Sequence, residues 1–181
     1  NIKIAVALLW ISSAKTVADF LFGVIPLFVL MGLLVSVAGM GKDTYDIAQS
    51  MLRKVRGGLG MATVVANAIF AAITGVSIAS ATVFTRISVP EMLRYGYKGR
   101  FAVGTVAGSS VLGMLIPPSI LLIIFALIAE ESVGDLFIAG IVPGLITIAL
   151  YIAVIWLVAW FLPELAPRAP KSPWSHRWRT L

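Results

Sequence analysis

The sequence predicts an all-α integral membrane protein, and three observations support this fold class. Of the 181 residues, 60% are hydrophobic and 12% are charged, whereas soluble domains have about 45–50% apolar and about 25% charged residues. Four stretches carry no charge at all: residues 20–41, 57–85, 101–129 and 136–163. Each stretch has the length of about 20 residues that a helix needs to cross a bilayer. This composition excludes a water-soluble domain and a disordered chain.

The scarcity of reactive side chains excludes several classes of site. The chain has no cysteine and a single histidine, His176, so disulfides, thiolate ligands and histidine-based triads are excluded. The net charge of +6 does not indicate nucleic acid, because 12 of the 14 basic residues fall in three segments, 42–56, 86–100 and 163–181. The positive-inside rule places these segments in the cytoplasm and the acidic connector, residues 130–135, outside.

The first part of the chain predicts a transmembrane helix followed by an interfacial helix. Residues 4–11 are apolar but too short to span, which fits a remnant of an earlier span or an interfacial piece. Residues 17–41 predict a transmembrane helix. In residues 43–56 apolar side chains recur at helical spacing, which indicates an amphipathic helix on the cytoplasmic interface, although a solvated linker helix explains the same pattern. The apolar positions are Tyr45, Ala48, Met51, Leu52 and Val55.

The second uncharged stretch has basic residues at both ends, so the charge rule does not allow it to cross the membrane once. Its 29 residues would reach about 44 Å as one helix. Folded in half at Thr74-Gly75-Val76-Ser77, each arm would reach about the middle of the membrane. We therefore interpret residues 57–95 either as a re-entrant hairpin or as one tilted helix that breaks the charge rule.

The third stretch, residues 101–129, predicts a broken transmembrane helix. Pro117 and Pro118 stand near its centre, where proline removes a backbone donor and restricts the residue before it. The freed carbonyls, with serine hydroxyls, can hold a small cation, and the amides at a half-helix N-terminus can hold an anion. Paired interruptions in apolar segments indicate a transporter binding site.

Helix packing is the alternative explanation for the small and polar residues in the spans. Gly104 with Gly108, and Gly140 with Gly144, have the spacing of close helix contacts. Residues 136–162 predict the last transmembrane helix, with Pro143 as a kink or close to the first turn. Residues 163–181 predict a cytoplasmic tail or linker.

Three motifs carry a resemblance to a known family. They are residues 28–32 (FVLMG), 66–77 (ANAIFAAITGVS) and 108–119 (GSSVLGMLIPPS). In this order they closely resemble the large membrane subunit of tripartite ATP-independent periplasmic (TRAP) transporters, the DctM type, over roughly residues 20–161. The resemblance implies one inverted-repeat half of an elevator-type transporter with a re-entrant hairpin and a broken helix. A second repeat is expected to follow residue 181, so the chain is expected to be a fragment of a larger protein.

The resemblance also implies a function, partners and a site. The expected function is Na⁺-coupled import of organic acids, such as C4-dicarboxylates or sialic acid, across the bacterial inner membrane. The expected partners are a periplasmic substrate-binding protein and a small four-helix membrane subunit. No cofactor is expected besides Na⁺, and Thr74, Gly75, Ser109 and Ser110 are the predicted ion ligands. The predicted substrate- and ion-binding residues are Asn67, Thr74, Gly75, Ser77, Gly108, Ser109, Ser110, Gly113, Pro117 and Pro118.

Three other functions fit parts of the sequence. Another elevator-type divalent-anion/Na⁺ symporter would share the hairpin and the broken helix, with a poorer local match. An intramembrane serine hydrolase using Ser77 or Ser109 needs a neighbouring base, and the histidine and lysines all lie outside the uncharged stretches. A non-transporting assembly subunit would have no need of helices broken at mid-depth. The absence of Asp, Glu and His from these stretches favours Na⁺ over a proton as the coupling ion.

Overall fold

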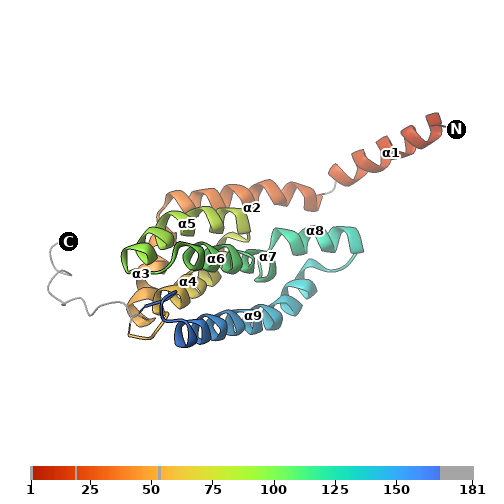
Figure 1. The fold of residues 1–181 in the computed structure, drawn as a ribbon. Helices are drawn as coiled ribbons and strands as arrows, with labels where there is room; N and C mark the ends of the chain where they lie inside the picture. Colours follow the sequence, from red (N-terminus) through yellow and green to blue (C-terminus); the bar gives the residue numbers. More distant parts are fainter. Residues whose placement is uncertain (1, 19, 53, 168–181) are drawn as a thin grey trace.

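The computed structural model describes residues 2–18, 20–52 and 54–167, and within these ranges every regular element is a helix (Figure 1). This agrees with the predicted all-α membrane fold. Among the described helices, α9 is the only one long and apolar enough to cross a membrane by itself, and two bent combinations, α2 with α3 and α6–α7 with α8, could each form one further span. The helices are α1 (Ile2–Val17), α2 (Phe20–Val37), α3 (Met40–Leu52), α4 (Gly58–Thr74), α5 (Ser77–Arg94), α6 (Gly99–Ser110), α7 (Leu112–Leu115), α8 (Ile120–Ala129) and α9 (Val133–Phe161).

The helix α4 is the centre of the bundle. Alanine, glycine, valine and threonine dominate its sequence, and apolar residues occur all around it, which is typical of a helix that is buried on every side. It packs against α2, α3, α5, α6, α7 and α9. One core cluster joins it to α3, α5 and α6 around Phe70 and Phe84, whose rings meet edge to face with centroids 5.6 Å apart. The predicted substrate- and ion-binding residues therefore lie on α4, on the helices that pack against it, or in the short segments that directly follow these helices.

The first predicted span ends earlier than expected. The helix α2 stops at Val37, whereas the sequence predicted a helix over residues 17–41, and α3 begins at Met40 at 62° to it. Gly39 lies between them with a φ of +79°, a left-handed conformation that glycine adopts without steric cost. The predicted C-terminal end of the span, residue 41, is therefore wrong. A single glycine makes the bend, and no charged residue interrupts the stretch to mark it.

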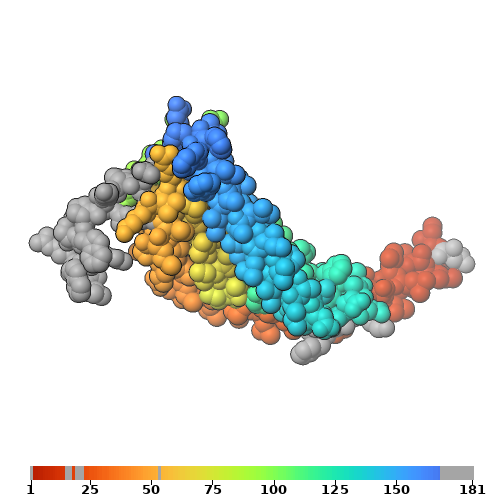
Figure 2. All heavy atoms as spheres, turned by 90° about the horizontal axis from the view of Figure 1, so that it is seen from below, coloured from red at the N-terminus to blue at the C-terminus, as the bar shows by residue number. Residues whose placement is uncertain are grey.

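The helix α9 lies along one face of the bundle, where Figure 2 shows it as a blue-to-cyan ridge beside the yellow of α4. Pro143 is the eleventh of its 29 residues, so it lies within the helix and not close to the first turn. Gly140 and Gly144 face the break between α7 and α8. A Cβ on Gly140 would lie 3.1 Å from the Leu115 carbonyl oxygen, and one on Gly144 would lie 3.2 Å from Ile116 Cγ1. Packing therefore explains this glycine pair.

Candidate functional site

The helices α4 and α5 form a helical hairpin. Only Gly75 and Val76 separate the end of α4 at Thr74 from the start of α5 at Ser77. Gly75 has a φ of +63°, the left-handed conformation that commonly ends a helix, and the two arms pack against each other. The interpretation of residues 57–95 as one tilted helix is therefore wrong. We call residues 74–77 the tip of the hairpin.

Buried polar side chains connect the two arms below the tip. The Asn67 amide oxygen accepts a hydrogen bond from Ser80 Oγ at 2.9 Å, and the Asn67 amide nitrogen donates to Ser109 Oγ on α6. Closer to the open end, the hydroxyls of Thr63 and Ser88 lie 2.7 Å apart. All five side chains are completely buried. Because each bond pairs polar groups that water cannot reach, these residues fix how α4, α5 and α6 pack together.

The tip packs directly on the segment that interrupts the broken helix, residues 116–119, which we call the proline loop. A Cβ placed on Gly75 would lie 2.5 Å from the Pro118 carbonyl oxygen. The Gly75 carbonyl accepts a 3.4 Å hydrogen bond from the Ile120 backbone N–H. The two interruptions that the sequence singled out are thus in contact, backbone against backbone.

Two further glycines allow other helices to approach the tip. A Cβ on Gly113 would lie 3.0 Å from both the N and the Cα of Ser77. A Cβ on Gly32, in α2, would lie 3.5 Å from the side chains of Thr74 and Val76. The tip is therefore enclosed by α2, by α7 and by the proline loop.

The proline loop frees backbone carbonyls and satisfies only some of them. Pro117 and Pro118 have no N–H, so the carbonyls of Gly113 and Met114 have no helical donor four residues ahead. The Ser119 hydroxyl donates to the Met114 carbonyl at 2.7 Å and also caps the N-terminus of α8. The peptide bond between the two prolines is cis. The backbone hydrogen bonds described outside the helices include none to the Gly113 carbonyl, which makes this oxygen a candidate ligand.

Four helix ends converge where the tip meets the proline loop. The C-terminal ends are those of α4, at Thr74, and of α7, at Leu115. The N-terminal ends are those of α5, at Ser77, and of α8, at Ile120. C-terminal ends carry partial negative charge and N-terminal ends partial positive charge. The same small volume can therefore stabilise a cation and an anion without any ionised side chain.

Comparison with known proteins identifies the family. The sequence model of the family described as "Tripartite ATP-independent periplasmic transporter, DctM component" matches residues 3–180. The chain belongs to this DctM family. It is 41% identical over 135 residues to the C4-dicarboxylate TRAP transporter large permease protein DctM of Pseudomonas aeruginosa, a match that covers 75% of this chain and 32% of the relative.

Other members of the DctM family carry different substrate names. The sialic acid TRAP transporter permease protein SiaT of Haemophilus influenzae is 36% identical over 70% of this chain and 21% of its own length. The ectoine/5-hydroxyectoine TRAP transporter large permease protein UehC of Ruegeria pomeroyi is 30% identical over 87% of this chain and 36% of its own length. The chain thus spans about a third or less of these relatives.

The predicted site residues of this DctM chain fall into two groups. The first group surrounds the contact between the tip and the proline loop, and the second lies along the arms or faces another helix. Seven residues separate Asn67 from Thr74, which is about 10 Å of helix, so Ser109, bonded to Asn67, lies well below the tip. The first group is Thr74, Gly75, Ser77, Gly113, Pro117 and Pro118, and the second includes Asn67, Gly108 and Ser109.

Three predicted site residues have contacts within the protein that do not require a ligand. The hydroxyls of Thr74 and Ser110 donate to the carbonyls of Phe70 and Ala107, each at 2.9 Å within its own helix. Each hydroxyl keeps its oxygen lone pairs as acceptors for a cation. Gly108 faces α9, because a Cβ there would lie 3.2 Å from a ring carbon of Tyr151. Gly108 therefore has a packing contact that explains it without a ligand.

Three residues were missing from the predicted set. Ser119 follows the double proline and begins α8, a position where serine is a recognisable helix cap. Gly32 ends the first of the three family motifs, residues 28–32, but neither it nor Ser80 was assigned a role, because their contacts with the tip and with Asn67 arise only in the folded chain.

Proposed function

We propose that this chain forms part of the moving transport domain of an elevator-type, Na⁺-coupled permease in the bacterial inner membrane, and that the permease imports organic acids. The observation that carries the proposal is the contact between the hairpin tip and the proline loop, where four helix ends converge. Discontinuous helices that meet inside a membrane are typical of transporter sites for substrates and coupling ions. The family membership supports the same function.

The levels at which the hairpin contacts α9 support the proposal that it enters and leaves the membrane on the same side. At its open end, a Cβ on Gly57 would lie 2.8 Å from Ala159 Cβ, whereas at the tip end Pro117 lies against Gly140. These two levels of α9 are 19 residues apart, or about 28 Å. The helix α8 continues from the proline loop for ten residues, about 15 Å further. A tip at this level stops short of the far side, where we place the acidic connector.

The coupling ion is proposed to bind at the negative helix ends. Hydroxyl oxygens of Thr74 and Ser110 and the carbonyl of Gly113 are neutral oxygen ligands of the type that suits Na⁺. Gly75 follows Thr74 in the tip and lies against the proline loop. Ser109 would join this set only after its hydrogen bond with Asn67 opens. Binding of the ion would hold the tip against the proline loop and complete the substrate site.

The substrate is proposed to be an organic acid whose carboxylate faces the N-terminal ends of α5 and α8. Relatives named for C4-dicarboxylate and sialic acid support this substrate class. We further propose that a periplasmic binding protein delivers the substrate and that a small four-helix membrane subunit supports the moving domain. The chain spans about a third of the C4-dicarboxylate relative, so the complete permease is needed for transport.

Sodium dependence of uptake tests the ion site. In the complete permease reconstituted with its partners, Thr74→Val and Ser110→Ala are expected to raise the Na⁺ concentration for half-maximal uptake about tenfold, equivalent to about 1.4 kcal/mol. The matched control is Thr147→Val, since Thr147 has the same bond within its helix, to the Pro143 carbonyl at 2.7 Å, but belongs to α9 and to neither the tip nor the proline loop. Unchanged sodium dependence in both the Thr74 and the Ser110 variant would refute the site.

Cysteine labelling tests the topology, and the absence of native cysteine makes single-cysteine variants straightforward. A re-entrant hairpin predicts that Arg86→Cys reacts with an impermeant reagent from the cytoplasm, and that Val76→Cys and Val111→Cys react only in states that open the site. A Val76→Cys variant that stays unreactive in every state, together with Arg86→Cys labelling only from outside, would contradict this topology.

A further inference from the structure

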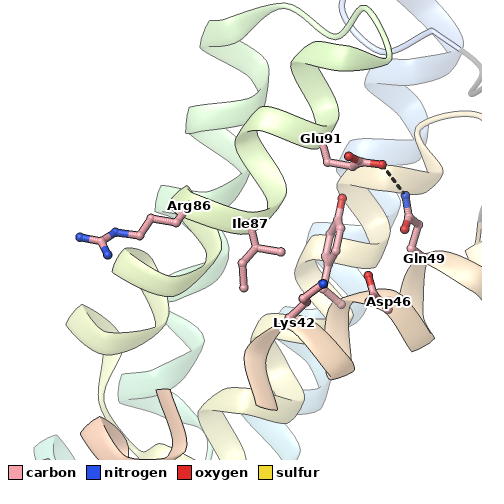
Figure 3. Close-up of a pocket in the computed structure, with 7 residues that line it drawn as sticks. Lys42, Asp46, Gln49, Arg86, Ile87 and Glu91 are labelled. Atoms are coloured by element: carbon pink, nitrogen blue, oxygen red, sulfur yellow. Dashed lines mark hydrogen bonds between the residues drawn. The ribbon is translucent and has the colours of Figure 1, made fainter. Parts of the chain in front are cut away.

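A pocket of about 330 Å³ lies between α3 and α5, away from the tip and the proline loop (Figure 3). No step of the proposed transport mechanism uses it. Its lining combines two basic and two acidic side chains with an amide and a tyrosine. The lining residues are Lys42, Tyr45, Asp46, Gln49, Arg86, Ile87 and Glu91.

Four polar lining residues gather in one part of this pocket. In Figure 3, Asp46, Gln49 and Glu91 lie near Lys42, whereas the Arg86 side chain points away from them. Gln49 donates a 3.5 Å hydrogen bond to the Glu91 carboxylate. Among the described residues, no ion pair joins two members of the lining, although Glu91 lies 4.0 Å from Arg94 one turn further along α5. The pocket is therefore open to a ligand that carries one charge of each sign.

The acidic side of the pocket is partly withdrawn from water. Burial raises the pKa of the Asp46 carboxyl, and the neighbouring acidic groups Asp43 and Glu91 add to the rise, against Lys42. Tyr45 is 2% exposed, and its hydroxyl lies close to the Thr63–Ser88 hydroxyl pair. An added cation on this side would relieve the carboxylates.

The surroundings of the pocket indicate a lipid surface. The helix α3 is amphipathic and bends away from α2 by 62°. It exposes apolar side chains one turn apart, Ile47 at 61% and Met51 at 76%, and Val37 at the end of α2 is 87% exposed. Apolar groups exposed beside lysine and arginine are typical of a helix that lies in the headgroup region of a membrane.

We propose that this pocket binds the zwitterionic headgroup of an aminophospholipid, such as phosphatidylethanolamine, from the cytoplasmic leaflet. Its phosphate pairs with Lys42, and its primary ammonium donates to the carboxylates of Asp46 and Glu91. Such charge-assisted hydrogen bonds are stronger than neutral ones. The lipid would tie α3 to the α5 arm of the hairpin. The proposal depends on the chain lying in a membrane and is independent of transport.

Native mass spectrometry of the purified chain tests the proposal. Detergent-solubilised protein is mixed with phosphatidylethanolamine, phosphatidylcholine or phosphatidylglycerol at equal concentration. Retention of phosphatidylethanolamine is expected to exceed that of the other two about tenfold, the effect of losing one charge-assisted hydrogen bond. The trimethylated amine of phosphatidylcholine has no N–H donor, and phosphatidylglycerol has no cation. Equal retention of all three lipids would overturn the proposal.

Single substitutions test separately the binding of the phosphate and of the ammonium group. Lys42→Gln and Asp46→Asn are each expected to lower phosphatidylethanolamine retention about tenfold, while the matched control Lys54→Gln, outside the pocket, leaves it unchanged. Both substituted side chains are exposed, so folding is expected to persist, and the melting temperature checks it. An effect of Lys42→Gln without one of Asp46→Asn would reduce the pocket to a general anion site. Equal competition by free phosphoethanolamine would assign it to a soluble ligand and overturn the lipid assignment.

Discussion

The tip and the open end of the hairpin are both built on a glycine with positive φ, but they are fastened differently. At the open end Gly57 packs against α9, the Arg56 guanidinium lies 5.2 Å from the centre of the Trp160 ring, and the Lys98 N–H donates to the Leu165 carbonyl at 3.1 Å. At the tip, the three atoms nearest to a Cβ on Gly75 are all backbone atoms of the proline loop.

This difference separates an anchor from a contact that can open. Side-chain contacts spread over several residues tolerate small movements, because the side chains can readjust. The closest contacts of the tip, those of Gly75 with the proline loop and of Gly113 with Ser77, are made by backbone atoms and leave no side chain to readjust. We therefore expect the open end to hold the hairpin to α9 throughout the transport cycle, and the tip to respond to ion and substrate.

Substitution at the tip is expected to have the largest effect. Gly75→Ala places a Cβ 2.5 Å from the Pro118 carbonyl oxygen and forces alanine into a left-handed conformation. Neither strain can be relieved by rotating a side chain, so the free energy of unfolding should fall by about 3 kcal/mol. Thermal unfolding of the purified chain measures the loss, and uptake by the complete permease should be abolished.

Gly104→Ala is the matched control for this variant. Gly104 lies inside α6 with no atom within 4 Å of the added Cβ, so alanine should stabilise the helix by up to about 1 kcal/mol. If the two alanine variants have the same stability, the contact between the tip and the proline loop does not constrain the hairpin.

The corresponding substitution at the open end should cost less and should be partly reversible. Gly57→Ala places a Cβ 2.8 Å from the Ala159 Cβ, a side-chain atom, and we expect a loss of about 2 kcal/mol. Ala159→Gly removes that atom. A double-mutant cycle should therefore give a favourable coupling energy of about 1 kcal/mol, with only the backbone strain at residue 57 remaining. Strict additivity of the two substitutions would contradict the contact.

The smallest effect is expected for Tyr97 at the open end, and it depends on pH. Burial raises the pKa of the Tyr97 hydroxyl to about 12, an increase that the nearby Leu59 backbone partly offsets. The unfolded chain ionises at about 10, so this contribution to stability is complete below pH 10 and is lost as the pH rises towards 12. Tyr97→Phe should melt like the original chain at pH 8 and lose less stability at pH 11. Parallel pH profiles would contradict this assignment.

Sequence and structure agree where the signal is local. The glycine in Thr74-Gly75-Val76-Ser77 predicted the tip, and the double proline predicted the helix break. Glycine permits, and proline prevents, particular backbone conformations whatever the neighbouring segments are. The same reasoning missed the bend at Gly39, since a single glycine in an apolar stretch is as common in packed helices as in turns. It also grouped Ser109 with Thr74, although about 10 Å of helix separates their levels.

The sequence by itself determined that the chain is helical, apolar and interrupted twice, because composition, charge-free length and proline act without reference to other segments. It also determined the family. Tertiary structure alone decided that the two interruptions touch, that Asn67 bonds to Ser80 and Ser109, and that Lys42 and Glu91 line one pocket. These pairings join residues 13 to 49 positions apart. These contacts depend on how whole helices pack against one another, and the sequence pattern of a single segment does not specify which other segment will lie next to it.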